Sequence, residues 1–110
     1  MKLFDASLSL LERSLDVRLQ KQNVLASDLA NADTPGFKPL DVDFAKAMAG
    51  SAPATPAEVP APQLGLDGNG VDRDRTLVAL AQNGMQYGAA AQVAAKKLAI
   101  LRYVASDGSN

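Results

Sequence analysis

Few residues in this chain could do chemistry, because it has neither Cys nor His. That composition removes thiol nucleophiles, disulfides, imidazole acid–base catalysis and the usual zinc ligands. Two carboxylate pairs remain, Asp41 with Asp43 and Asp72 with Asp74, but neither has a third ligand or a Gly-rich loop nearby. Strand alternation accounts for the first pair and helix-start charges for the second. We therefore predict no enzyme, no catalytic or metal-binding residue and no cofactor.

Basic and glycine-rich segments are the other places where a ligand could bind. Lys96, Lys97 and Arg102 could contact phosphates, but their pattern is more typical of a solvated helix face. Residues 66–70 lack the spacing and the Lys of a phosphate-binding loop. The formal net charge is −1, and no segment is basic enough to indicate nucleic-acid binding. Neither a nucleic-acid partner nor a small-molecule substrate is expected.

Length and composition favour packed helices over a thick globular core. The 110 residues allow one domain, 1–110, and the 47% apolar residues are mostly Ala, Leu and Val. Residues 1–31 predict a long amphipathic helix, because no Pro or Gly interrupts them and apolar side chains recur every three or four residues. This stripe consists of Phe4, Leu8, Leu11, Leu15, Leu19, Gln22, Ala26 and Leu29.

A chain reversal follows the first helix. Pro35 disfavours helix at the preceding residue, and Pro-Gly is the preferred centre of a type II turn. We expect this turn to set the direction in which the chain leaves the helix, with Asn31 bonding locally. Its residues are Asn31, Asp33, Thr34, Pro35, Gly36 and Phe37.

The middle of the chain changes character twice. Residues 32–48 should hold the turn and a short extended segment, since Leu40, Val42 and Phe44 alternate with Asp residues. Residues 49–70 contain four Pro among Ala, Ser, Thr and Gly, which predicts a Pro/Ala-rich flexible linker.

Residues 71–110 predict a second long helix with a polar tail, and Asp72 is a suitable N-cap. Apolar and small residues keep a strict spacing of three and four, which predicts a left-handed coiled-coil seam. The seam consists of Leu77, Leu80, Gly84, Tyr87, Ala91, Ala94, Leu98, Leu101 and Ala105. Gly84 and Gly88 suggest a closely approaching backbone, the alternative being plain tolerance of Gly.

A membrane-spanning helix and a signal peptide are two other interpretations of the helical segments. The uncharged run 76–95 is long enough to span a membrane, but its Gln and Asn residues argue against that. A signal peptide is not expected, because Asp5, Glu12 and Arg13 interrupt the apolar stretch near the N-terminus. The fold predicted is therefore mainly α, with two long terminal helices forming a coiled-coil-like pair, joined by the extended segment and the loop.

Two runs of residues carry a family resemblance. The run Asn23-Val24-Leu25-Ala26-Ser27-Asp28-Leu29-Ala30-Asn31-Ala32-Asp33-Thr34-Pro35-Gly36-Phe37-Lys38 resembles the N-terminal signature of the flagellar rod and hook family. The run 68–72 and the helix through Asn83, Tyr87 and Tyr103 are similar to the matching end of its smallest rod members. The uninterrupted turn and the short length indicate a proximal rod member. Asp28 departs from the family's frequent Asn, and Phe37 from its common Tyr.

The resemblance implies a structural subunit of the bacterial flagellar basal body, in the proximal rod in the periplasm, exported without a cleaved signal peptide. Its expected partners are other rod subunits, copies of itself, basal-body ring or rod-adaptor proteins and the flagellar export apparatus. The alternative is a cytosolic helical adaptor that binds partners through the same stripes. The expected helix-packing and assembly residues are Phe4, Leu8, Leu11, Leu15, Leu29, Leu77, Leu80, Gly84, Tyr87, Gly88, Leu98 and Leu101.

Overall fold

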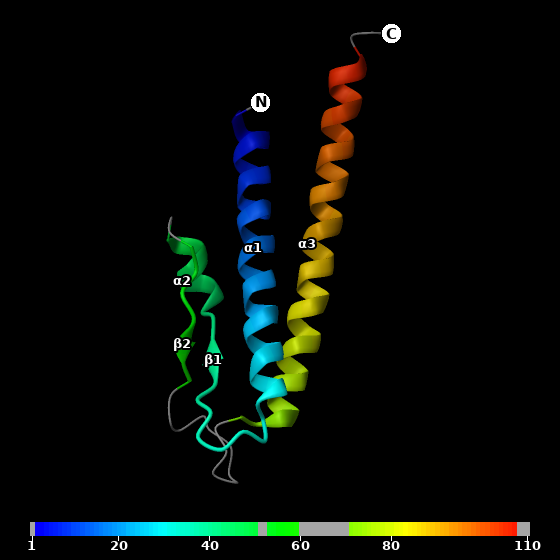
Figure 1. Cartoon of the computed structure of the whole chain (residues 1–110). Coiled ribbons are helices and arrows are strands. Elements are labelled where there is room, and N and C mark those ends of the chain that lie inside the picture. The colour runs from blue at the N-terminus through cyan, green and yellow to red at the C-terminus, as the bar shows by residue number, and fades with distance from the viewer. Residues whose placement is uncertain (1, 51–52, 60–70, 108–110) are drawn as a thin grey trace.

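Two long helices dominate the computed structural model, which describes residues 2–50, 53–59 and 71–107. The elements in chain order are α1 (Lys2–Ala30), β1 (Leu40–Asp41), α2 (Phe44–Ala49), β2 (Ala57–Glu58) and α3 (Arg73–Asp107). Figure 1 shows α1 and α3 running antiparallel, with the three short elements on the other side of α1. The molecule is elongated, with extents of 65 × 24 × 16 Å. The predicted mainly helical fold with a long helix at each end is confirmed.

The turn predicted after α1 is present. The Asn31 side-chain amide donates to the Ser27 carbonyl over 2.9 Å, one turn back, and Thr34 Oγ1 lies 3.2 Å from Asn31 Oδ1. The Phe37 N–H then donates to the Thr34 carbonyl over 3.2 Å. Gly36, the third residue of this turn, has a φ of 76°. This bond and the positive φ are the features of a type II turn.

The extended segment is shorter than the alternation predicted. Only Leu40 and Asp41 form a strand, which pairs antiparallel with β2 so that Leu40 faces Glu58. Phe44 begins helix α2 instead of continuing the strand, because the Asp43 carboxylate accepts the Lys46 N–H over 3.0 Å and so caps that helix. The alternation therefore stops at Val42, which is fully buried.

Part of the predicted linker is packed against the rest of the chain. Residues 57–58 form β2, and the Val59 N–H donates to the Pro39 carbonyl over 3.0 Å. We refer to residues 39–50 and 53–59 as the arm. The remaining linker residues, 51–52 and 60–70, lie outside the described residues.

Helix α3 begins at the expected cap. Asp72 accepts the Arg75 N–H through its carboxylate over 3.1 Å, and its carbonyl accepts the Thr76 hydroxyl over 2.7 Å. The helix has 35 residues, more than α1, and in Figure 1 its C-terminal end extends beyond the start of α1. Among the described residues, no helix combines the length and apolarity needed to cross a membrane.

Candidate assembly interface

The face that α3 turns toward α1 agrees with half of the predicted seam. In the first series, Leu80, Ala94 and Leu101 are half-buried, and Tyr87 is 36% exposed. The second series is shifted by one residue, since Leu77 and Leu98 are 50% and 52% exposed. The buried or half-buried positions one residue earlier are Thr76, Asn83, Ala90 and Lys97, although the predicted Ala91 is half-buried as well.

Helix α1 shows the same one-residue difference in its C-terminal half. Leu19, predicted to be in the stripe, is 49% exposed and Ala26 is exposed, whereas Arg18 is half-buried and Leu25 is buried. With these two replacements the spacing of four and three is unbroken along the whole helix. The resulting stripe is Phe4, Leu8, Leu11, Leu15, Arg18, Gln22, Leu25 and Leu29.

Polar side chains at the middle of the helix pair explain the shift. Asn83 Nδ2 donates to the Arg18 backbone carbonyl and to Gln22 Oε1, both over 2.8 Å. Arg18 Nη1 donates to Gln86 Oε1 over 2.7 Å. These bonds are made only if Asn83 faces α1, which turns Leu77 outward. We call Arg18, Gln22, Asn83 and Gln86 the polar clamp.

Contacts toward the two ends confirm the antiparallel direction. The Lys97 ammonium lies 5.3 Å from the centre of the Phe4 ring near the N-terminus of α1. Arg73 and Asp33 form an ion pair at the opposite end, where both side chains are exposed. Figure 1 shows the helices closest at the end near Arg73 and spreading apart toward the chain termini.

The two glycines of α3 do not mark a close backbone approach within the subunit. A Cβ atom at Gly84 would meet only Gln22 Nε2, at 3.9 Å. At Gly88 no atom of the part of the chain that the structure describes lies within 4 Å of such an atom. The expectation of close approach is therefore wrong for the α1–α3 pair, and both positions are open on the subunit surface.

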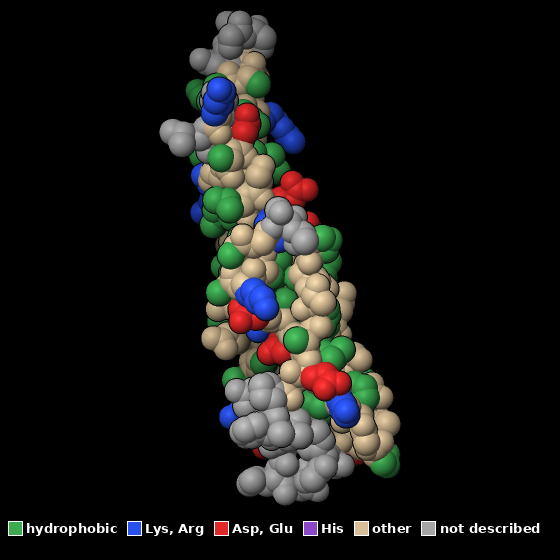
Figure 2. All heavy atoms as spheres, turned by 90° about the vertical axis from the view of Figure 1, so that its left-hand side faces the viewer, with side chains coloured by type: hydrophobic (Ala, Val, Ile, Leu, Met, Phe, Trp, Pro, Cys, Tyr) green, Lys and Arg blue, Asp and Glu red, His purple; other side chains and the backbone are tan. Residues whose placement is uncertain are grey.

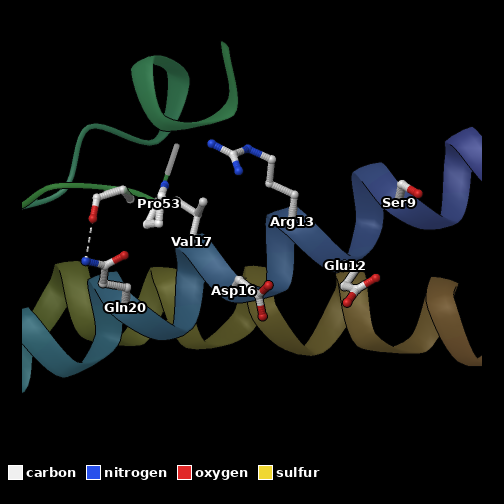
Figure 3. Close-up of a pocket in the computed structure, with 8 residues that line it drawn as sticks. Ser9, Glu12, Arg13, Asp16, Val17, Gln20 and Pro53 are labelled. Carbon is white, nitrogen blue, oxygen red and sulfur yellow. Dashed lines mark hydrogen bonds between the residues drawn. The ribbon is translucent and has the colours of Figure 1, made fainter. Parts of the chain in front are cut away.

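Another face of α1 holds the arm, mainly through backbone atoms of the arm. Arg13 donates to the Ala47 carbonyl from Nη2 over 2.6 Å, and Gln20 donates to the Ala54 carbonyl over 2.7 Å. Lys21 Nζ lies 3.3 Å from the Val42 carbonyl. Figure 3 shows Arg13 and Gln20 reaching from α1 toward the arm. The apolar pattern of the sequence contains no signal for these contacts.

Asp28 completes the attachment of the arm and is itself buried. Its Oδ1 accepts the Leu40 N–H over 3.0 Å, and only 4% of the residue is exposed. Burial raises the pKa of this carboxyl above its ordinary value, the Leu40 bond lowers the pKa, and nearby Asp41 raises it further. Asp28, where the resembled family often has Asn, thus connects α1 to β1.

A groove of about 310 Å³ separates α1 from the arm (Figure 3). Its lining includes the polar residues Ser9, Glu12, Asp16 and Gln20 and the apolar residues Val17 and Pro53. In the part of the chain that the structure describes, no group of three or more His, Cys, Asp or Glu residues is placed to hold a metal ion.

Helix α3 carries an exposed apolar surface. Large side chains remain uncovered on more than one side of this helix. They are Leu77, Val78, Met85, Val93, Leu98, Ile100, Tyr103 and Val104. No acidic residue occurs between Arg75 and Ser106, so this surface is apolar and basic. Figure 2 shows hydrophobic side chains among Lys, Arg and an acidic side chain at the upper end of the molecule.

Comparison with known proteins shows which family the chain resembles. The family described as "Flagella basal body rod protein" matches residues 13–38, which span most of α1 and the turn. The flagellar basal body rod protein FlgB of Escherichia coli (strain K12) is 37% identical over 111 residues, covering 76% of this chain and 80% of that protein. FlgB of Salmonella typhimurium is 34% identical with the same coverage.

A shorter match has a higher identity. FlgB of Aeromonas hydrophila is 44% identical over 45 residues, which cover 41% of this chain and 34% of that protein. The long matches to FlgB span most of both chains at more than 30% identity. The chain therefore belongs to the FlgB family of flagellar basal body rod proteins and is a structural subunit of that rod.

Proposed function

We propose that the chain builds the proximal rod through its two terminal helices, which pair in a coiled-coil-like manner and then pack against neighbouring subunits. The observation that carries this proposal is the uncovered apolar surface of α3. Leu98 is 52% exposed and Tyr103 71% exposed on a helix that is apolar on several sides. A helix of that kind is normally buried, and the described residues of its own subunit leave this surface uncovered.

Two groups of residues take different roles in this proposal. An inner group holds α1 against α3, and it consists of Phe4, Leu8, Leu11, Leu15, Leu29, Leu80, Tyr87 and Leu101. An outer group meets neighbouring subunits, and it consists of Leu77, Gly84, Gly88 and Leu98. Leu77 and Leu98 are about half exposed, and no described atom lies within 4 Å of a Cβ at Gly88, which leaves room for an approaching neighbour. The turn Asn31 to Phe37 directs the chain from α1 into the arm.

A helical rod requires two different complementary surfaces on each subunit, because only contacts that do not close produce a filament. The outer face of α3 provides one surface in this proposal. The side of the subunit that carries the arm is available as the other. Other rod subunits and further copies are the neighbours. Contacts with ring or rod-adaptor proteins and the export apparatus, export without a cleaved signal peptide and a periplasmic position are supported by the family resemblance alone.

Replacing Leu98 by Asp tests the role of the outer group. The charge lies on an exposed position, so the subunit should keep its helix content, while burial of the carboxylate against a neighbour should be strongly unfavourable. We expect cells that carry Leu98→Asp as their only copy to export the protein but lack motility. The matched control is Gln92→Asp, an exposed polar position of the same helix. Normal swimming with Leu98→Asp would contradict the proposed interface.

A further inference from the structure

The most deeply buried polar side chain of α3 lies in the middle of its contact with α1. Asn83 is 2% exposed, and both of its side-chain hydrogen bonds go to α1, to the Arg18 carbonyl and to Gln22. Its Oδ1 has no hydrogen-bond partner among the described residues. A buried acceptor without a partner costs free energy that an apolar side chain would not cost. Stability alone therefore does not explain an Asn at this position.

The clamp around Asn83 joins three elements. The Arg18 side chain donates to Gln86, one turn further along α3, and its guanidinium lies 4.0 Å from the centre of the Phe44 ring at the start of α2. The Gln22 side chain that receives the Asn83 amide also lies beside Gly84, where a Cβ atom would be 3.9 Å from its Nε2. A shift of α3 along α1 would break these bonds together, because they all use one level of the pair.

The apolar part of the contact specifies the register poorly. Its α3 residues repeat at heptad spacing and include the small side chains Ala90 and Ala94. A slip of one heptad would move α3 by about 10 Å and bring Thr76 or Ala90 to the level of Asn83. Neither residue carries an amide to bond both Arg18 and Gln22. Small side chains fit many levels of a partner helix, so packing alone discriminates weakly between registers.

We infer that Asn83 is the residue that specifies the register of α3 on α1, acting through the Arg18 carbonyl and Gln22. A single buried polar residue that fixes alignment at a cost in stability is well known in helix pairs. The inference rests on the helix pairing of the proposed function, but it concerns the free subunit and requires no rod. A correct register places the outer face of α3 at a defined height relative to the arm.

Distance measurement between two spin labels tests this inference. The chain has no Cys, so labels attached to Asn23→Cys and Gln92→Cys report only these two exposed positions. The parent should give one distance population. In the Asn83→Leu variant, a second population displaced by several Å should contain at least about a third of the molecules, as expected when slipped registers become nearly equal in free energy. Leu fills the site and favours helix, so this variant should remain folded.

The matched control is Gln82→Leu, the same kind of change at the adjacent exposed position. It should keep the single distance population of the parent. A single parental distance in Asn83→Leu would overturn the register role while leaving the proposed rod assembly intact. An equal second population in Gln82→Leu would also overturn the register role. A parent without a defined distance would contradict the helix pairing itself, and with it the proposed function.

Discussion

Asn83 Nδ2 lies 2.8 Å from the backbone carbonyl oxygen of Arg18, a residue 65 positions earlier in the chain. This bond crosses between the two terminal helices and decides which faces meet. Because Asn83 points inward, Leu77 and Leu98 point outward, and the subunit keeps an apolar surface for its neighbours. One polar contact thus links the packing within the subunit to the surface available for assembly.

Removing that contact should destabilise the isolated subunit. Asn83→Ala leaves the Arg18 carbonyl and Gln22 Oε1 without the amide that they share, so we expect a loss of about 1–3 kcal/mol in the free energy of unfolding. Urea unfolding followed by circular dichroism measures it. Gln82→Ala is the matched control, because Gln82 is exposed and should change stability by less than about 0.5 kcal/mol. Equal effects of both substitutions would contradict the clamp.

Asp28→Asn should raise stability at neutral pH. The Asn Oδ1 can still accept the Leu40 N–H, while the cost of burying a charge disappears. The unfolded carboxyl takes up a proton near its ordinary pKa of 3.8, but the folded one does so at a higher pH. Between these pH values the folded state binds more protons, so acidification through this window favours folding of the parent. The advantage of Asp28→Asn should therefore shrink as pH falls.

Asp28→Leu is the companion variant. It removes the acceptor, leaves the Leu40 N–H unpaired and should cost about 1–3 kcal/mol. Thermal unfolding of parent and both variants between pH 3 and 7 gives the comparison. An advantage of Asp28→Asn that grows on acidification would contradict the raised pKa of Asp28.

Gly36→Ala should lower stability by about 1 kcal/mol, because Gly36 has a φ of 76° that an L side chain adopts poorly. No atom of the described residues lies within 4 Å of the added methyl group, so the cost expected here is conformational. Calorimetric unfolding measures the change. Gly88→Ala serves as the comparison, since its site is equally open but helical, and it should stabilise by about 0.5–1 kcal/mol. A stabilising Gly36→Ala would rule out the turn geometry.

Local signals in the sequence predicted the elements that depend on them. Pro35 and Gly36 specify the turn by their own backbone preferences, and Asp72 specifies the start of α3 by capping. The seam depended on tertiary contacts and was one residue off at Leu77, Gly84 and Leu98. Hydrophobicity ranks Leu77 above Thr76 as a core residue, but the hydrogen bonds of Asn83 select the neighbouring face.

The arm was least predictable, because its contacts with α1 use backbone atoms. Gln20 binds the Ala54 carbonyl, and Arg13 binds the Ala47 carbonyl, whatever side chains the arm carries at those positions. The alternation of Leu40, Val42 and Phe44 marks only the first part of the arm, and no apolar periodicity marks residues 45–59. Its Pro and Ala content is typical of a flexible linker, and only the α1 side chains reveal that part of it packs.

The most direct measurement of the central claim is site-specific photo-crosslinking at Leu98 within assembled basal bodies. A photoreactive residue at this exposed position should form a covalent product with a neighbouring rod subunit, because the outer face of α3 is proposed to be buried there. The same chain free in dilute solution should form no such product. Basal bodies that contain the labelled chain but yield no cross-link at position 98 would contradict assembly through this face.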